Sequence, residues 1–166
     1  LEAGDLRLAA KYLFSDGNEK LPALSLTGSL SVPTGAQLYG QNGVDASAGL
    51  LAAKRFSDWI IYAGGGYSYF SDDEQSGITF TGHSANGFIG AEYEVSTHLS
   101  VICALSGGTS LVESIRMFPD YETYLDTGLK YQLTDGYEVE LLIRENPAPS
   151  RGTTDFTFAF GVMRKL

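Results

Sequence analysis

The chain is poor in the features that mark several common protein classes. Its single cysteine, Cys103, cannot form an internal disulfide and is expected to pack as a small hydrophobic residue within the run VICAL. No apolar stretch approaches the roughly 20 residues that a transmembrane helix needs, so only a β-barrel would carry this chain across a bilayer. Its 11 basic residues are scattered among 20 acidic ones, which argues against binding to nucleic acid.

What the chain has instead is a repeated alternation of apolar and polar residues. Near the C-terminus, Phe156, Phe158 and Phe160 alternate with small or polar residues, and the same period of two recurs from Leu6 onwards. Successive side chains of a β-strand point to opposite faces, so this period predicts strands with one apolar and one polar face. The 20 glycines, 10 tyrosines and 9 phenylalanines also favour strands and turns.

Turn signals divide the chain into predicted strands at residues 5–14, 23–32, 46–56, 59–70, 78–95, 99–105, 121–133, 137–144 and 155–164. Short connections, such as Ser57-Asp58, alternate with long ones, such as 33–44 and 106–120. Outer-membrane barrels show this asymmetry, with short periplasmic turns and longer outer loops. We therefore predict an all-β fold with one domain over residues 1–166. It is an antiparallel up-and-down β-barrel of the transmembrane outer-membrane type, with about 8–10 strands.

The two faces of the predicted strands differ in charge. The apolar face carries no charged residue and consists of Leu6, Leu8, Leu24, Leu26, Leu30, Ile61, Ala63, Ile89, Ala91, Val101, Cys103, Leu125, Leu129, Val139, Leu141, Ile143, Phe158 and Phe160. The polar face carries Arg7, Lys11, Glu92, Glu94, Glu122, Asp126, Lys130, Glu138, Glu140 and Arg144, with glycine and serine between them. Such a face suits a narrow polar lumen, because the interior of a soluble barrel must be apolar. Alternation alone does not decide which face is inside, so a soluble lipocalin-like barrel that binds an apolar ligand is the alternative.

Several aromatic residues are predicted to lie near strand ends: Trp59, Tyr67, Tyr69, Tyr93, Tyr121, Tyr131 and Tyr137. In a membrane barrel such rings form girdles at the two interfaces. Cross-strand packing also favours aromatic residues, but the girdle is the preferred interpretation.

The strand count raises a difficulty. Bacterial single-chain barrels normally have an even number of strands, and a periplasmic C-terminus would put the start of the first strand on the outer side. Either one or more strands preceding Leu1 are absent from this sequence, which is the explanation we favour, or the segment 78–95 is wrongly divided into strands. Such a sheet would have two edges without partners.

The segments ANGFIGAEYEVSTHLSV (85–101), YLDTGLKYQLTDGYEVELLIRENPAPS (124–150) and DFTFAFGVMRKL (155–166) resemble the DUF3187 family of uncharacterised bacterial outer-membrane proteins. The runs GDLRLAAKYLF, LTGSLSVPTG and LLAAKRF are similar to the central portion of the same family. The resemblance covers nearly the whole chain and implies an outer-membrane barrel, a full length greater than 166 residues, and no catalytic residues. One departure is the ending Met163-Arg164-Lys165-Leu166, where barrels typically end on an aromatic residue.

Two groups of residues are weak candidates for chemistry. His83-Ser84 is compatible in composition with a lipid-modifying hydrolase, but adjacent residues of one strand point to opposite faces and cannot easily act as base and nucleophile. Asp72, Asp73 and Glu74 would offer oxygens to a divalent cation between lipopolysaccharide phosphates, although a solvated acidic turn is favoured. We predict no catalytic residues, no metal and no cofactor.

The charges of the polar face are the strongest functional candidate. In a barrel of this size they are predicted to form a salt-bridge network that fills the interior, with a cation-selective path as the alternative. The sequence thus predicts a non-enzymatic protein of the Gram-negative outer membrane with a structural or passive small-solute role. Its predicted partners are membrane lipid, lipopolysaccharide, the barrel assembly machinery and further copies of the chain. A lipid-modifying hydrolase ranks third, after the soluble barrel.

Overall fold

A computed structural model describes residues 5–35, 43–71, 74–75, 78–79, 81–110, 120–134, 136–147 and 156–164. These residues form strands β1 (Leu6–Ser15), β2 (Ala23–Val32), β3 (Asp45–Phe56), β4 (Trp59–Tyr69), β5 (Glu74–Gln75), β6 (Ile78–Thr79), β7 (His83–Glu94), β8 (Leu99–Thr109), β9 (Tyr121–Thr134), β10 (Tyr137–Glu145) and β11 (Phe156–Arg164). Within them, no helix is long and apolar enough to cross a membrane.

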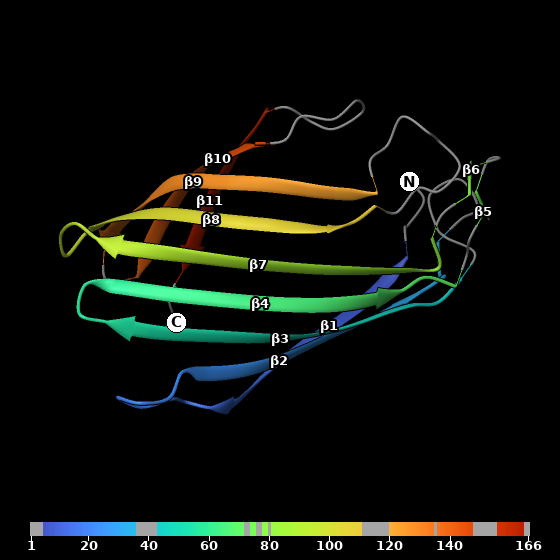
Figure 1. The fold of residues 1–166 in the computed structure, drawn as a ribbon, viewed down its shortest axis with the longest axis horizontal. Helices are drawn as coiled ribbons and strands as arrows, with labels where there is room; N and C mark the ends of the chain where they lie inside the picture. Colours follow the sequence, from blue (N-terminus) through green and yellow to red (C-terminus); the bar gives the residue numbers. More distant parts are fainter. Residues whose placement is uncertain are drawn as a thin grey trace.

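Nine of the strands form one antiparallel sheet in the order β1-β2-β3-β4-β7-β8-β9-β10-β11, and β5 pairs with β6 separately. Each strand of the large sheet pairs with its neighbours along the chain, which is the predicted up-and-down order (Figure 1). The predicted all-β class and the nine strands are confirmed. The predicted strand 78–95 is instead two elements, β6 and β7, since the chain leaves the sheet before Gly82, whose carbonyl accepts a hydrogen bond from the N–H of Phe70.

The prediction for residues 99–105 was too short, because β8 continues through Gly107 and Gly108 to Thr109. These glycines resemble a turn signal in the sequence. In the sheet they pair with Gly87 and Asn86 of β7, and a Cβ at Gly108 would lie 3.0 Å from the carbonyl oxygen of Ala85. The backbones approach closely here, which is a position that favours glycine inside a strand.

Strand ends that precede or follow short connections and those that precede or follow long ones lie at opposite ends of the sheet (Figure 1). The hairpin between β3 and β4 turns through Ser57 and Asp58, with Ser57 at a φ of 53°, and the β7–β8 connection covers only residues 95–98. The strand ends that flank residues 33–44, 70–82, 110–120 and 146–155 lie at the other end. We call these the short-turn end and the long-connection end.

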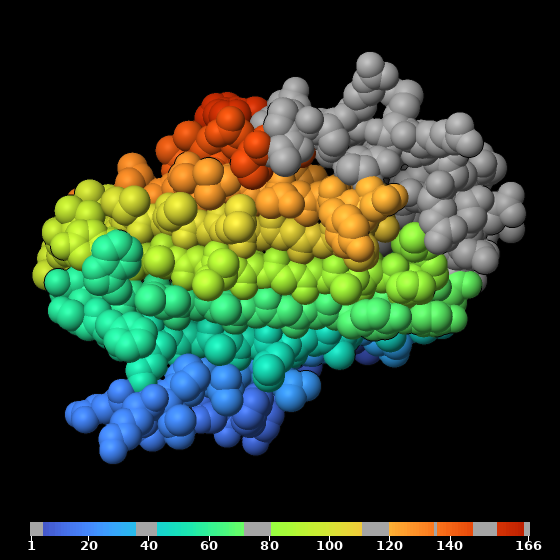
Figure 2. Space-filling model, viewed as in Figure 1, coloured from blue at the N-terminus to red at the C-terminus, as the bar shows by residue number. Residues whose placement is uncertain are grey.

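The sheet is strongly curled and has two distinct faces. The face with the most buried side chains, which we call the inner face, carries Glu92, Ile102 and Glu138 at 9%, 6% and 8% exposure. The other face, the outer face, leaves large apolar side chains exposed, including Leu50 at 50%, Ile89 at 57%, Leu141 at 47%, Phe158 at 69% and Phe160 at 70%. Strands β3, β4, β7, β8 and β9 lie side by side and present a continuous outer surface (Figure 2).

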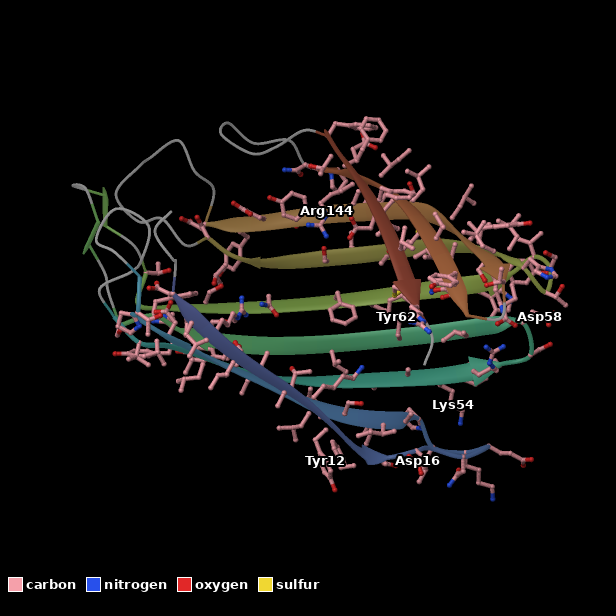
Figure 3. The ribbon with its side chains drawn as sticks, turned by 180° about the vertical axis from the view of Figure 1, so that it is seen from behind. Tyr12, Asp16, Lys54, Asp58, Tyr62 and Arg144 are labelled. Carbon is pink, nitrogen blue, oxygen red and sulfur yellow. The ribbon has the colours of Figure 1, made fainter. Side chains whose placement is uncertain are left out.

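The sheet does not close on itself. β1 and β11 are its two edges, and neither has a second partner among the described strands (Figure 3). Their side chains are exposed on both faces, in contrast to the central strands, where exposure alternates. Both edge strands start at the long-connection end and run towards the short-turn end.

Candidate functional site

Lys130 is the centre of a cluster of ionised side chains on the inner face. Its Nζ lies 2.7 Å from Oε2 of Glu92 on β7 and 3.9 Å from Oε1 of Glu138 on β10. Only 21% of the Lys130 side chain and 11% of each glutamate side chain are exposed. In the register, Lys130 lies directly opposite Ser100 of β8 and Glu140 of β10. Its side chain reaches the two glutamates diagonally, Glu138 on the adjacent β10 and Glu92 on the far side of β8. Glu140 itself forms no ion pair among the described residues.

A second cluster lies closer to the long-connection end. Arg144 of β10 donates to both carboxylate oxygens of Asp126 on β9, from Nε at 2.7 Å and from Nη2 at 3.0 Å. The guanidinium also lies 5.2 Å from the ring centroid of Tyr124, whose hydroxyl donates to Glu122 at 2.8 Å. Asp126 and Arg144 are direct partners in the β9–β10 register, so the sheet itself places them side by side. A two-pronged contact of this kind fixes orientation as well as charge.

These two clusters form what we call the charged wall: Glu92, Asp126, Lys130, Glu138, Glu140 and Arg144 of β7, β9 and β10. A further ion pair stands at its short-turn end, where Arg55 of β3 donates to both oxygens of Glu94 at 2.6 and 2.8 Å. Arg55 was missed in the sequence analysis. The run Leu50–Arg55 does not alternate in polarity, so the face of Arg55 follows only from the register, which places it opposite Ile60 of the inner face.

The sequence analysis also missed large apolar side chains on the inner face. A cavity of about 530 Å³ beside the charged wall is lined by Tyr62 and Phe88, with Ile60, Ile102 and Leu142. The rings of Tyr62 and Phe88 lie 6.2 Å apart, and Figure 3 shows Tyr62 inside the curl of the sheet. The inner face is therefore not lined by charges and small residues alone. Tyr62 lies between Ile61 and Ala63 of the outer face, so alternation would have placed it here.

The inner face of β2–β4 has a different character. Ser29, Ser47 and Ser68 are direct partners across three strands, and Ser31 lies one step further along β2. Oγ of Ser29 and Oγ of Ser47 are 2.7 Å apart, and Nη2 of Arg7 donates to Ser29 at 3.2 Å. We call Ser29, Ser31, Ser47 and Ser68 the hydroxyl wall. The other residue predicted on the polar face of β1 is Lys11. Its side chain is exposed and forms no hydrogen bond or ion pair among the described residues.

The remaining predicted chemical groups do not assemble into a site. Ser84 is 8% exposed on the inner face and hydrogen-bonds to Thr109, whereas His83 is exposed and stacks on Tyr67. Asp72 and Asp73 lie outside the described residues, as does the side chain of Glu74. Within the described part of the chain, no group of three or more His, Cys, Asp or Glu could hold a metal ion.

The aromatic residues predicted near strand ends are all exposed, from 37% for Tyr93 to 73% for Tyr121. Two groups can be distinguished along the strands. Trp59, Tyr93, Tyr131 and Tyr137 lie towards the short-turn end, and the rings of Trp59 and Tyr93 are 4.7 Å apart. Tyr67, Tyr69 and Tyr121 lie towards the long-connection end. Cys103 is also exposed on the outer face and is not packed in a core.

An up-and-down antiparallel sheet with an apolar outer face and an ionised inner face has the fold of an outer-membrane β-barrel wall. The chain belongs to the family described as protein of unknown function (DUF3187), which matches residues 1–166, as predicted. It is similar to the crystal structure of the COG4313 outer membrane channel from Pseudomonas putida F1, with a TM-score of 0.74 and 18% identity. The match covers 98% of this chain but 66% of that channel, so this chain spans only that share of the channel's length. No curated protein matches the chain.

Proposed function

We propose that this chain builds the wall of an outer-membrane β-barrel that lets a small solute pass passively and catalyses no reaction. The observation that carries this proposal is the separation of the two faces. Leu50, Ile89 and Leu141 are about half exposed on the outer face, while Glu92 and Glu138 are buried on the inner face. This is the arrangement required where acyl chains surround the wall and polar groups line its interior.

The ends of the strands support a position in a membrane. Trp59, Tyr93, Tyr131 and Tyr137 at one end and Tyr67, Tyr69 and Tyr121 at the other correspond to the two aromatic girdles of membrane barrels. The strands between them have 9–14 residues. About 9–11 tilted residues are enough to cross the hydrocarbon layer. Short turns at one end would then face the periplasm, and the long connections would face lipopolysaccharide.

The soluble lipocalin-like alternative requires the opposite arrangement. Its leucine and phenylalanine rows would converge on a dry interior, and Glu138 would face solvent. An exposed apolar face of this extent is unstable in water and marks a lipid or protein contact. The hydrolase alternative has no support at His83 and Ser84, because one side chain is exposed on the outer face while the other is buried on the inner face.

The charge of the inner face favours cations over anions. Around the charged wall, the acidic side chains Glu92, Glu94, Glu122, Asp126, Glu138 and Glu140 outnumber the basic side chains Arg55, Lys130 and Arg144. An excess of one sign on a low-dielectric wall concentrates counter-ions of the opposite sign. The ion pairs and the Tyr62 and Phe88 rings occupy much of the interior, so the path is expected to be narrow.

The first test uses Cys103, the only cysteine of the chain, which lies at the middle of β8 opposite Ala91 and Thr127. Bimane attached to Cys103 in the full chain, reconstituted in vesicles, should be quenched by brominated lipid and not by aqueous iodide. The matched control moves the label to the neighbouring inner-face position in a Cys103→Ser, Ala104→Cys variant, which should show the reverse. Quenching of the Cys103 label by iodide alone would contradict the proposal.

The second test measures passage. In planar bilayers the full chain should give a small conductance with a preference for K⁺ over Cl⁻. The neutralised variant Glu140→Gln should lower that preference and leave insertion unchanged, because Glu140 makes no ion pair that holds the wall together. A large anion-selective conductance, or none after verified insertion, would contradict the proposed role in passage.

A further inference from the structure

A cavity of about 410 Å³ lies on the inner face at the long-connection end, separate from the charged wall. It is lined by side chains of β1–β4, which form two rows across the sheet. One row runs from Arg7 through Ser31 to Asp45, each opposite the next in register. The other row runs from Ser29 through Ser47 to Ser68. The two rows present charged and hydroxyl groups to the same space.

Most of these polar groups are available to a ligand. Ser31, Asp45 and Ser68 make no side-chain hydrogen bond or ion pair within the described residues. Ser29 and Ser47 bond to each other, but each oxygen keeps capacity to accept a further hydrogen bond. Arg7 has five N–H donors, and one contact, to Ser29, accounts for a single nitrogen. The charged wall differs, because both of its cations, Lys130 and Arg144, are already bound by carboxylates.

The spacing of the rows points to the size of the ligand. Arg7 and Asp45 are separated by β2, so their backbones are about 10 Å apart, and they form no ion pair. Between them stand hydroxyls, which both donate and accept hydrogen bonds. A molecule that spans from the Arg7 donors to the Asp45 acceptor would pass over Ser31 of β2. Ser29 and Ser47 lie beside that path in the other row, and Ser68 lies one strand further, on β4. This matches a compact solute whose own hydroxyl groups are distributed around its edge.

Two further residues that line the cavity restrict the kind of ligand that it can bind. Asp5, just before β1, lines the same cavity and adds a second carboxylate to it, with its Oδ1 accepting from the N–H of Gly35. This carboxylate lowers the attraction of the site for an anionic group. Phe70 follows β4 beside Asp45 and also lines the cavity, offering an aromatic surface to C–H groups.

We propose that this cavity binds a neutral polyhydroxylated solute, of the chemical class of sugars and sugar alcohols. The inference rests on the proposed function, for which it names the solute class. Arg7 donates to ligand oxygens, Asp45 accepts from ligand hydroxyls, and the serines of the hydroxyl wall do both. Phe70 packs against the apolar face of the solute.

The test is ligand-observed saturation-transfer NMR and titration calorimetry on the full chain in detergent micelles, with D-glucose as the probe. Glycine betaine serves as a zwitterionic probe and gluconate as an anionic one. Glucose should bind, and gluconate and betaine should bind at least tenfold more weakly. The variant Asp45→Asn/Ser68→Ala should weaken glucose binding about tenfold, because it removes a charged acceptor and a hydroxyl from the cavity. Among the described residues neither side chain has a hydrogen-bond or ion-pair partner, so the fold should be unchanged.

The matched control is Ser25→Ala, on the same face of β2 but towards the short-turn end, which should leave glucose binding unchanged. Glucose binding that the double variant does not weaken, tighter binding of betaine or gluconate, or no glucose binding at all would overturn the inference. Binding in micelles needs no bilayer. Glucose binding by a chain that fails the Cys103 and conductance tests would therefore overturn the proposed function alone, and insertion without glucose binding would overturn this inference alone.

Discussion

The hydroxyl wall and the charged wall belong to one sheet and one face, yet their polar groups are held in different ways. In the charged wall, Lys130 reaches Glu92 across β8 and Arg144 reaches Asp126 on the adjacent strand, each at 2.7 Å. In the hydroxyl wall, Ser31 and Ser68 have no side-chain partner among the described residues. Alternation makes both surfaces polar, and register aligns the residues of both, but only the charged wall is held by ion pairs. We therefore expect the charged wall to contribute more to the stability of the sheet and the hydroxyl wall to be more open to a solute.

The largest expected effect comes from removing the cation of the charged wall. Lys130→Met should lower the free energy of unfolding by about 3–5 kcal/mol, because the buried Glu92 would lose the cation that lies 2.7 Å from it. The measurement is urea-induced unfolding in lipid vesicles, followed by the fluorescence of Trp59. The matched change in the hydroxyl wall, Ser47→Ala, should cost about 1 kcal/mol. Equal costs for the two variants would contradict the distinction between the walls.

A charge introduced on the outer face should destabilise folding equally behind the hydroxyl wall and behind the charged wall. Leu50→Arg in β3 and Leu141→Arg in β10 should each cost about 2–4 kcal/mol in bilayer folding, because both side chains would face the middle of the membrane. Glu140→Gln, the neighbour of Leu141 on the inner face, should change folding little. The same unfolding assay measures all three. A mild effect of both arginines with a severe effect of Glu140→Gln would favour a soluble barrel.

Alanine substitutions at two glycines should differ in their effect on the free energy of unfolding, by a smaller amount than the changes above. A Cβ at Gly128 of β9 would meet the carbonyl oxygen of Leu141 and lie 3.1 Å from the Cα of Leu142. A Cβ at Gly28 of β2 would have its nearest neighbour at 3.6 Å, the carbonyl oxygen of Ser47. Gly128→Ala should therefore destabilise by about 1–3 kcal/mol, whereas Gly28→Ala should be close to neutral. Identical unfolding curves for the two alanine variants would show that the tight packing around β9 relaxes without cost.

The order of the strands and the assignment of side chains to faces could be predicted from the sequence, because both follow from short-range patterns. Alternation with a period of two placed Leu141 and Phe160 on one face and Glu138 and Arg144 on the other. The short turns that join successive strands implied the up-and-down order. The ends of the strands were harder to predict where glycines lie inside a strand instead of in a turn, as Gly107 and Gly108 do in β8.

The ion pairs could not be predicted, because they depend on register. Lys130 and Glu92 are 38 residues apart in sequence, and a shift of one residue between strands would turn one of them to the opposite face. The sequence also gave no measure of how far the sheet curls. Alternation would have placed Tyr62 on the inner face. It does not show that the curl of the sheet brings the rings of Tyr62 and Phe88 to one cavity.

The common direction of the two edge strands restricts how this wall can be completed. If β1 met β11 directly, or met β11 of an identically oriented second copy, the new ladder would be parallel within an otherwise antiparallel sheet. Parallel strands are normally joined by crossover connections and form slightly weaker ladders, so a ring of identical copies is disfavoured at this seam. A fully antiparallel ring that contains this sheet takes up an odd number of other strands between β11 and β1.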